Sequence, residues 1–208
     1  MVIRKVKILF VLFLIICSVS NAQFLPGGID DKHKDDFKET GNLSGTSYAS
    51  FQSKYSKAFS EYGIDLGLNA GIMLNNFFGL GFNISYLATK PVSQIDDRSI
   101  VMRMSYYGLE PELVYNFSSK LHLSFRLMTG LAYIDYGENN VIDLPADYNG
   151  DWIFITEPSA VMNLKILKSF WIGFYGGYRI AQGVQLYGFD SEDMSGLFSG
   201  LQIKLIIK

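Results

Sequence analysis

The sequence predicts an all-β fold: a closed antiparallel eight-stranded transmembrane β-barrel, preceded by a cleaved signal peptide and a short flexible arm. Three observations predict this fold class. Hydrophobic residues alternate with small or polar ones from residue 63 to the end of the chain. Most predicted strands reach the about 9 to 11 residues that a tilted membrane strand needs. Short and long connections between these strands alternate strictly.

The composition excludes several other classes of protein. The 208 residues are 49% hydrophobic and 18% charged, which argues against a disordered chain. The mean hydropathy of +0.16 is too low for a bundle of membrane helices. No apolar run after residue 22 approaches the about 20 residues of a spanning helix. The formal charge of −2 provides no basic surface for nucleic acid.

The first 22 residues have the pattern of a secretory signal peptide. Three basic residues precede the apolar run 8–16, and the small residues Ser20 and Ala22 stand at positions −3 and −1 of a cleavage site. We expect cleavage between Ala22 and Gln23, which removes the three basic residues and takes the formal charge from −2 to −5. Cys17 follows an isoleucine, whereas a lipoprotein signal has a small residue there. Because Cys17 would be removed with the signal, we expect the mature chain to contain no cysteine.

A short segment after the signal differs in composition from the rest of the chain. Residues 30–36 mix acidic and basic side chains without apolar periodicity, which is typical of a solvated segment. We therefore divide the chain into the signal peptide 1–22, a flexible periplasmic N-terminal arm 23–45 and the barrel 46–208.

Seven strands follow from the period-two pattern, because side chains two residues apart lie on the same face of a strand. They cover residues 63–74, 78–86, 100–117, 121–133, 152–164, 170–180 and 201–207. The apolar parity changes near Gly108, which predicts a β-bulge there. Bacterial membrane barrels have an even number of strands. We place the eighth in residues 46–59, where the aromatic residues would also suit a helix face.

The connections predict the orientation of the barrel. Residues 75–76, 118–120 and 166–169 are tight, whereas 89–99, 137–151 and 183–195 are long and polar. Outer-membrane barrels have short periplasmic turns and longer external loops. The sequence therefore predicts a periplasmic N-terminus in a Gram-negative outer membrane.

The apolar face of the strands is predicted to meet lipid. Eight strands enclose a narrow interior, which Gly, Asn and Ser side chains fit better than rows of Leu, Phe and Tyr. Aromatic residues gather near strand ends, as in the interfacial girdles of membrane barrels, although aromatic residues also favour strands in general. They are Phe77, Phe78, Tyr106, Tyr107, Tyr115, Phe117, Tyr133, Tyr136, Trp152, Phe170 and Trp171.

These features carry a resemblance to a known family. With the signal and the amphipathic terminal strand, the segments 67–71 (GLNAG) and 107–117 (YGLEPELVYNF) resemble the PorT-like family of small outer-membrane β-barrels. More broadly, residues 45–208 are similar to OmpX- and OmpA-type eight-stranded barrels. The chain departs from the pattern at its end, where 205–208 lacks the aromatic residue that such barrels often carry. The narrower resemblance implies an accessory role in a secretion or motility assembly.

The inward face is predicted to hold a salt-bridge network that plugs the barrel. Pairing strands across the tight turns puts Glu112 opposite Arg126. Glu157 falls opposite or diagonal to Arg179. Arg103 is a further inward candidate, as is Lys204 on the last strand. Opposite charges across strands are favourable and buried charges need partners. An ion path or gate is the alternative interpretation.

No catalytic, cofactor or metal site is predicted, and we expect no enzymatic activity. After the signal the chain has two histidines, His33 in the arm and His122 on an inward face near a periplasmic turn. A lipid A-modifying enzyme needs an activated serine at the outer surface, and no base can be placed there. Asp147, Asn149 and Asp151 have the alternate spacing of a calcium loop, but its glycine is misplaced and its closing glutamate is missing.

The long loops are acidic and are the candidate contact sites. Their acidic residues include Asp143, Asp147, Asp151, Asp190, Glu192 and Asp193. The expected partners are outer-membrane lipid and lipopolysaccharide, and envelope proteins that contact the loops. We favour a structural or interaction role in the envelope. The alternatives are a secretion or motility accessory, a lipid A-modifying barrel enzyme and a soluble periplasmic lipid-binding β-barrel.

Overall fold

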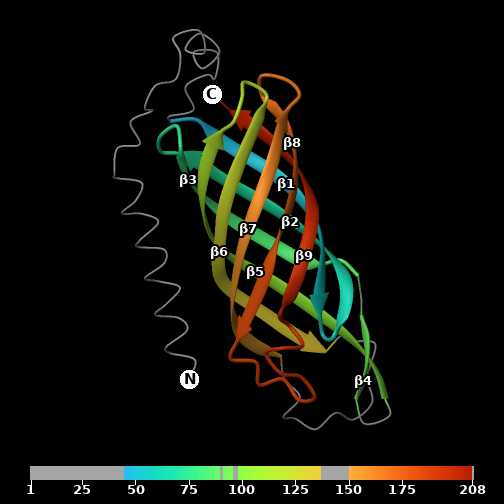
Figure 1. The fold of residues 1–208 in the computed structure, drawn as a ribbon. Helices are drawn as coiled ribbons and strands as arrows, with labels where there is room; N and C mark the ends of the chain where they lie inside the picture. The colour runs from blue at the N-terminus through green and yellow to red at the C-terminus, as the bar shows by residue number, and fades with distance from the viewer. Residues whose placement is uncertain (1–44, 90, 96–97, 137–149, 208) are drawn as a thin grey trace. The chain divides into compact units, whose positions relative to one another are not determined.

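The computed structural model describes residues 45–89, 91–95, 98–136 and 150–207 (Figure 1). These residues form nine β-strands. They are β1 (Ser47–Ala58), β2 (Glu61–Met73), β3 (Phe78–Leu87), β4 (Val92–Ile95), β5 (Arg98–Asn116), β6 (Leu121–Tyr136), β7 (Asp151–Lys165), β8 (Phe170–Gln182) and β9 (Gly196–Ile207). Within the described residues, no helix is long and apolar enough to cross a membrane. The predicted cleavage site at Ala22 and Gln23 and most of the predicted arm lie outside these ranges.

Eight of the strands close into an antiparallel barrel, which confirms the predicted fold class (Figure 1). Strands that follow one another in the chain pair side by side, and β1 pairs with β9 to close the barrel. β3 pairs with β5 directly, so β4 forms a separate hairpin with β5 outside the closed ring. β1 confirms the strand predicted in residues 46–59, and β4 forms within the predicted loop 89–99.

The barrel has two different ends (Figure 1). At the first, which we name the turn end, lie the short connections β2–β3, β5–β6 and β7–β8 and the end of β9. At the second, the loop end, lie the β4–β5 hairpin and the segment 183–195. The β1–β2 connection is also at the loop end but contains only Phe59 and Ser60. The predicted difference between the ends is therefore present, with one tight turn among the longer connections.

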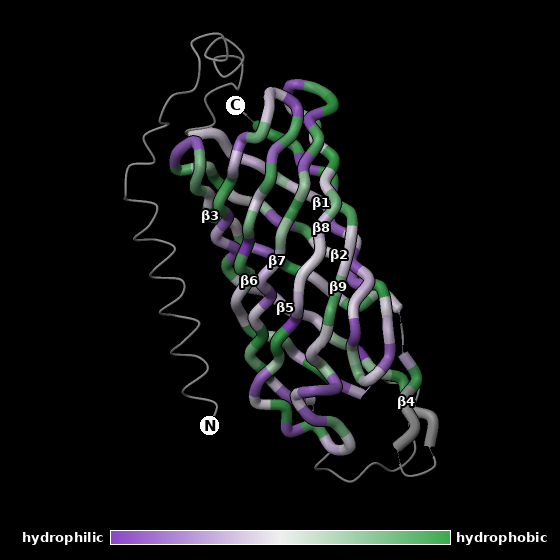
Figure 2. Tube along the Cα trace, viewed as in Figure 1, coloured by the Kyte–Doolittle hydropathy of each residue, from purple (hydrophilic) through white to green (hydrophobic). Residues whose placement is uncertain are grey.

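Along the barrel strands, buried positions alternate with more exposed ones, and hydrophobic and hydrophilic residues interchange over short distances (Figure 2). The outward positions carry exposed large hydrophobic side chains on all eight barrel strands. Examples are Phe51, Leu68, Ile84, Leu109, Phe125, Met162, Phe174 and Ile203. Together these side chains form a continuous apolar surface, which is larger than the apolar patches that a water-soluble monomer normally exposes.

The predicted bulge near Gly108 is wrong. β5 keeps the same register to β6 on both sides of this residue, from Met102 to Glu112. Even-numbered residues of β5 therefore face inside on both sides of Gly108, from Met102 to Val114. Two residues of the predicted aromatic girdle are also placed differently, because Tyr106 and Trp171 occupy inward positions and are buried in the barrel.

Two prolines interrupt the backbone ladders at mid-barrel. The β5–β6 pairing skips Glu110 and Pro111, and the β7–β8 pairing skips Glu157 and Pro158. Proline has no N–H to donate, so the ladder weakens at both points. Both interruptions adjoin a buried glutamate, so the prolines mark the level at which the lumen is charged.

Candidate functional site

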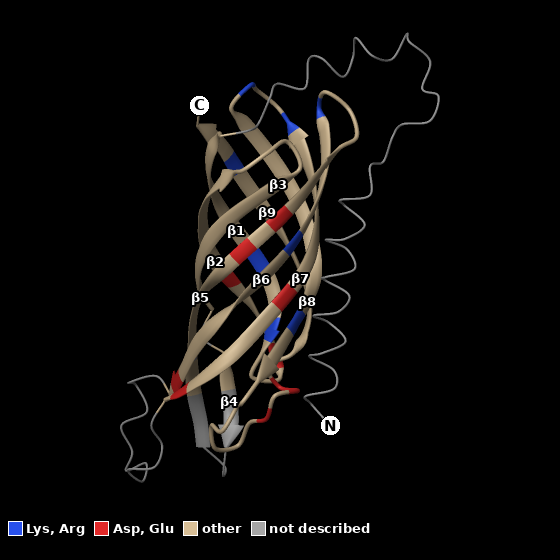
Figure 3. Cartoon of the chain, turned by 90° about the vertical axis from the view of Figure 1, so that its left-hand side faces the viewer, with Lys and Arg blue, Asp and Glu red and all other residues tan. Residues whose placement is uncertain are grey.

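The middle of the lumen holds a layer of buried ionic side chains, visible as neighbouring blue and red segments in Figure 3. The layer contains four cationic and four anionic residues, contributed by seven strands. They are Lys54, Arg126, Arg179 and Lys204, with Asp65, Glu110, Glu112 and Glu157. Since the two signs are equal in number, the layer is formally neutral.

Four of these residues form one cluster, which we name the charged tetrad: Lys54, Asp65, Glu157 and Arg179. Glu157 accepts from Arg179 Nε and from Lys54 Nζ, at 2.6 Å in each case. Arg179 Nη2 donates to Asp65 Oδ2 at 2.6 Å, and Lys54 Nζ lies 3.6 Å from the same oxygen. The ring of Tyr106 lies beneath both cations, at 4.8 Å from Lys54 and 5.0 Å from Arg179. The tetrad therefore cross-links β1, β2, β7 and β8 through the lumen.

The remaining ionic residues lie beside the tetrad in two further groups. Arg126 Nη1 donates to Glu110 Oε1 and to Gln202 Oε1, at 3.0 Å in each case. Lys204 Nζ donates to Glu112 Oε2 at 2.6 Å. Each ion of the layer thus has a partner of opposite charge, which buried charges require.

A small enclosed cavity separates the tetrad from the Arg126 group. Its volume, taken as the space open to the centre of a water-sized sphere, is about 10 Å³. Lys54, Glu157, Glu110 and Arg126 are among the side chains that line it. A cavity of this size is at the lower limit for one water molecule. In the described residues, the ionic layer therefore fills the lumen instead of lining a passage.

The predicted network residues are brought together in part. Glu157 and Arg179 form a direct ion pair. Glu112 and Arg126 are cross-strand partners in register, but their charges pair elsewhere, Arg126 with Glu110 and Glu112 with Lys204.

The inward placement of Arg103 is wrong. This residue lies between the buried residues Met102 and Met104, on the outward parity of β5, with Asp135 as its cross-strand partner. The prediction depended on the parity change expected at Gly108, which does not occur.

Sequence reasoning missed three members of the layer: Lys54, Asp65 and Glu110. The signal was present in the alternation of each strand. Asp65, for instance, is flanked by Ile64 and Leu66, so an apolar outward parity places the carboxylate inside. Lys54 was obscured because its strand was the least regular. Glu110 has the same parity as Glu112, so the alternation that places Glu112 inside also places Glu110 there.

At the turn end the lumen is closed by an aromatic group. His122 stacks on Trp171 with ring centroids 4.3 Å apart and planes 6° from parallel. His122 Nδ1 lies 2.6 Å from Asn116 Oδ1, which fixes the ring further. Trp171 also belongs to a buried cluster with Tyr48, Met73, Val114 and Ile206. His122 is thus a packed interior residue at the opposite end of the barrel from the longer connections.

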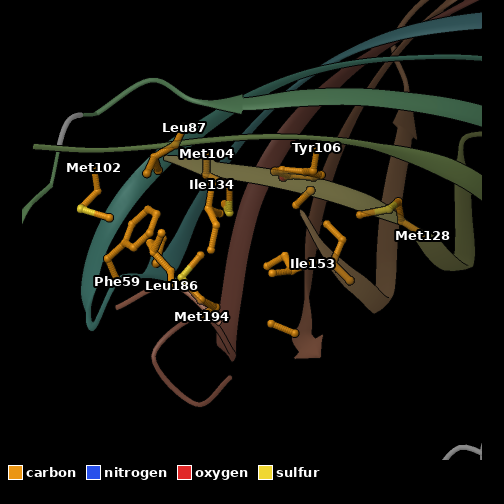
Figure 4. Packing of buried hydrophobic residues seen from close by; sticks show 14 residues of the cluster. Phe59, Leu87, Met102, Met104, Tyr106, Met128, Ile134, Ile153, Leu186 and Met194 are labelled. Atoms are coloured by element: carbon orange, nitrogen blue, oxygen red, sulfur yellow. The ribbon is translucent and has the colours of Figure 1, made fainter. Parts of the chain in front are cut away.

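At the loop end the lumen is filled by an apolar cluster (Figure 4), whereas the sequence predicts small and polar residues on the inward face. We name it the loop-end cluster. Its buried members are Ala58, Phe59, Leu87, Met102, Met104, Tyr106, Met128, Ala132, Ile134, Ile153, Ile155, Ala181, Leu186 and Met194. Leu186 and Met194 come from the 183–195 loop, which folds inward to reach the strands.

The described acidic loop residues hold the backbone of the loop end. Asp190 Oδ1 accepts from the N–H groups of Glu192 and Asp193, and Asp193 Oδ2 accepts from the Asp190 N–H. Asp151 Oδ2 accepts from Gln185 N–H at 2.6 Å. Asp143 and Asp147 lie outside the described residues. Within the described part, no group of three His, Cys, Asp or Glu side chains is arranged to hold a metal ion.

Comparison with known proteins places the fold. No protein-family model matches the chain, and no curated protein matches its sequence. Among solved structures, the chain resembles Ail, the attachment invasion locus protein of Yersinia pestis, with a TM-score of 0.50 and 12% identity over 79% of this chain and 100% of that one. Neisserial surface protein A (NspA) gives a TM-score of 0.54 and 9% identity over 81% and 99%. Ail in complex with the heparin analogue sucrose octasulfate gives 0.51 and 13% over 79% and 100%. At these identities the likeness establishes the fold: that of small eight-stranded outer-membrane β-barrels.

Proposed function

We propose that this chain is an integral outer-membrane protein with a closed lumen, which serves a structural or interaction role in the envelope through its loop end. The observation that carries the proposal is the outward apolar surface. Large hydrophobic side chains are exposed on every strand of the closed barrel. Lipid is the environment that makes such a surface favourable, and closure satisfies the backbone groups that lipid cannot.

The distribution of charge supports the same conclusion. A soluble lipid-binding barrel would place its apolar residues around an open cavity and its polar residues in water. Here the mid-barrel ions face inside and pair with one another, while Leu68 and Ile84 face outside on the two neighbouring strands β2 and β3. We therefore favour the membrane barrel over the soluble alternative.

The orientation follows from the connections. Small outer-membrane barrels keep short turns in the periplasm and longer loops outside. We infer that the turn end and the N-terminus are periplasmic and that the loop end faces the exterior. The described loop 183–195 would then offer Asp190, Glu192 and Asp193 to external partners.

The acidic character of this loop directs the choice of partner. The structure of Ail with sucrose octasulfate concerns a polyanionic ligand of that protein. Here Asp190 and Glu192 are exposed and Asp193 is half-buried on the described loop. Charge complementarity therefore favours a cationic protein surface, or divalent cations that bridge to lipopolysaccharide.

The proposed role is not enzymatic. Lipid A lies in the outer leaflet, whereas His122 is buried at the turn end and stacked on Trp171. It cannot activate a serine at the loop end without leaving the barrel. Membership of the PorT-like family, with an accessory role in secretion or motility, stays a hypothesis that rests on the sequence of 67–71 and 107–117.

Electrophoresis without and with boiling tests the proposal. The protein is expressed in a Gram-negative host, the outer-membrane fraction is isolated, and both samples are run on a denaturing gel. We expect a heat-dependent change in mobility in that fraction. Recovery in the soluble periplasmic fraction, with no change on boiling, would overturn the membrane assignment.

Replacement of the acidic loop tests the interaction role. Asp190, Glu192 and Asp193 are changed together to Asn, Gln and Asn, which keeps the side-chain shapes and removes the charge. Binding of cells to immobilised cationic protein and Mg²⁺-dependent retention of lipopolysaccharide are measured. Unchanged binding in both assays, with the heat-dependent shift intact, would remove this loop from the proposal.

A further inference from the structure

The loop 183–195 enters the mouth of the barrel. Leu186 and Met194 are buried, and Phe189 packs against the same loop-end cluster. In Figure 4 the side chains of Leu186 and Met194 point toward Phe59, which comes from the β1–β2 turn. Val184 packs there as well, so four apolar residues of one loop occupy the outer part of the lumen.

The loop-end cluster has two parts of different origin. Its wall is formed by strands, and includes Met102, Met104, Met128, Ile134 and Ile153. Its cap is formed by the loop and the two-residue turn. Strands held in a closed barrel are fixed, whereas a connecting segment can move without breaking the backbone ladder. Removing the cap would expose an apolar wall rich in methionine, a side chain that adapts to varied ligands.

The loop part of the cap is attached to both residues of the turn. Ser60 N–H donates to the Asp193 carbonyl at 3.1 Å, and Ser60 Oγ contacts Asp193 Oδ1. Nearby, Lys57 Nζ donates to the Glu192 carbonyl at 3.0 Å. The rings of Phe59 and Phe189 meet edge to face, with centroids 5.3 Å apart. We name the Ser60–Asp193 contacts the latch.

The turn that carries the latch has a strained backbone. Phe59 and Ser60 have φ of 55° and 63°, in the left-handed region that favours glycine. Two-residue hairpin turns with two positive φ angles normally contain Asn-Gly or a similar pair. The contacts to the loop offset this strain, and they keep Phe59 buried and Ser60 against Asp193. Backbone strain of this kind clusters at ligand clamps and switch regions of proteins.

We propose that loop 183–195 is a latched lid over an apolar binding site, which takes the apolar part of a small ligand in place of Leu186, Phe189 and Met194. The floor of the site is the charged tetrad, because Arg179 Nη1 lies 4.0 Å from the sulfur of Met104. The site is therefore a dead end that binds without transport. The lid and the site are inferred from the contacts alone. Only the side of the membrane from which a ligand arrives depends on the proposed function.

Cysteine labelling tests the lid. Met104→Cys places a thiol on the wall in a Cys17→Ser background, which removes the chain's other cysteine. A water-soluble maleimide is added to the protein in lipid nanodiscs. Asp193→Ala removes the side-chain contact of the latch and also the acceptor of the Asp190 N–H. We expect it to raise the labelling rate about ten- to a hundredfold, the effect of one lost hydrogen bond to a charged group. Glu192→Ala is the matched control, because it removes the same charge and leaves the latch atoms in place.

Two further variants keep the test decisive. Ser60→Gly cuts the side-chain part of the latch while relieving the positive φ, and it leaves the Asp190–Asp193 hydrogen bond of the loop in place. Ser60→Cys with Asp193→Cys, oxidised, locks the lid and should reduce labelling below that of the parent. Equal labelling of both cut variants, the Glu192→Ala control and the locked form would overturn the lid.

Ligand protection tests the site. The neutral apolar dye N-phenyl-1-naphthylamine is added before the maleimide. We expect it to slow labelling in the cut variants and to leave the locked form unchanged. Equal rates with and without the dye in the cut variants would refute the binding site. Because the heat-dependent shift is recorded for each variant, failure of the lid is separable from failure of the membrane assignment.

Discussion

Replacing Arg179 with methionine should destabilise the barrel by about 3–5 kcal/mol, the usual cost of removing one partner from a buried ion pair. Arg179 is 1% exposed and makes ion pairs with both Asp65 and Glu157. The substitution leaves two buried carboxylates with Lys54 as the single cation of the tetrad. The formal charge of the tetrad therefore changes from neutral to −1.

The distances set the scale of this effect. Each contact of Arg179 is 2.6 Å long. At an effective dielectric constant of about 20, unit charges at that separation attract by about 6 kcal/mol. Desolvation of each ion opposes the attraction by several kcal/mol, so the net loss is far smaller than the sum of two contacts. Methionine retains much of the volume of the arginine stem, which limits any contribution from a cavity.

Unfolding in urea from lipid vesicles measures the loss, with tryptophan fluorescence and the heat-dependent gel shift as two readouts. The double variant Arg179→Met with Asp65→Asn restores neutrality, and it should recover more than about 2 kcal/mol relative to Arg179→Met alone. Lys168→Met removes an exposed cation in the β7–β8 turn and is the control. A loss below about 1 kcal/mol for Arg179→Met, or no recovery in the double variant, would refute the electrostatic argument.

Two further substitutions test the lipid-facing surface of the barrel and the close contact between strands β5 and β6. Leu68→Lys puts a charge on an outward position that is 65% exposed. It should cost about 2–4 kcal/mol if that face meets lipid near the midplane. Folding into vesicles is the measurement, and Glu61→Lys, exposed at the loop-end start of β2, should have little effect. Gly130→Ala should cost about 1–3 kcal/mol because the added Cβ would clash with the Tyr107 carbonyl. Gly176→Ala is its matched control, since its Cβ meets no atom closer than 3.5 Å. Equal urea midpoints for the two alanine variants would contradict the reading of close strand contact at Gly130.

The architecture was predictable from the sequence because strand alternation is local. A one-residue shift would turn an entire strand inside out, so the apolar parity specifies the outward face. Even the irregular β1 followed from the need for an even number of strands. The wrong predictions, the bulge at Gly108 and the inward Arg103, came from an assumed change of parity within β5. Apolar residues at the inward positions Met102 and Met104 resembled a slip at Gly108, but they belong to the loop-end cluster.

Partner choice within the lumen was less predictable than strand pairing. Register alone puts Glu112 opposite Arg126, but long side chains reach diagonal positions and cross the narrow barrel. Arg126 reaches Glu110, and Lys204 on β9 reaches Glu112 on β5. The first contact is diagonal between the neighbouring strands β5 and β6, and the second joins strands that are not neighbours in the sheet, so directly opposed pairs in the hairpins predict neither. The lid was also missed, because 183–195 is polar on average although its four apolar residues Val184, Leu186, Phe189 and Met194 pack inward.

The arrangement of the lumen constrains where this protein can act. In the proposed membrane setting, outward Leu and Phe side chains remain in an apolar environment, so contacts inside the barrel must contribute much of its specificity. The tetrad supplies those contacts at mid-barrel and joins strands on opposite sides. Opening a passage there would separate paired ions that have no water to replace their partners. The loop-end cluster has no such restriction, because displacing Leu186 and Met194 exchanges one apolar contact for another. A ligand is therefore accommodated more readily at the loop end than at the tetrad, which keeps the barrel closed below it.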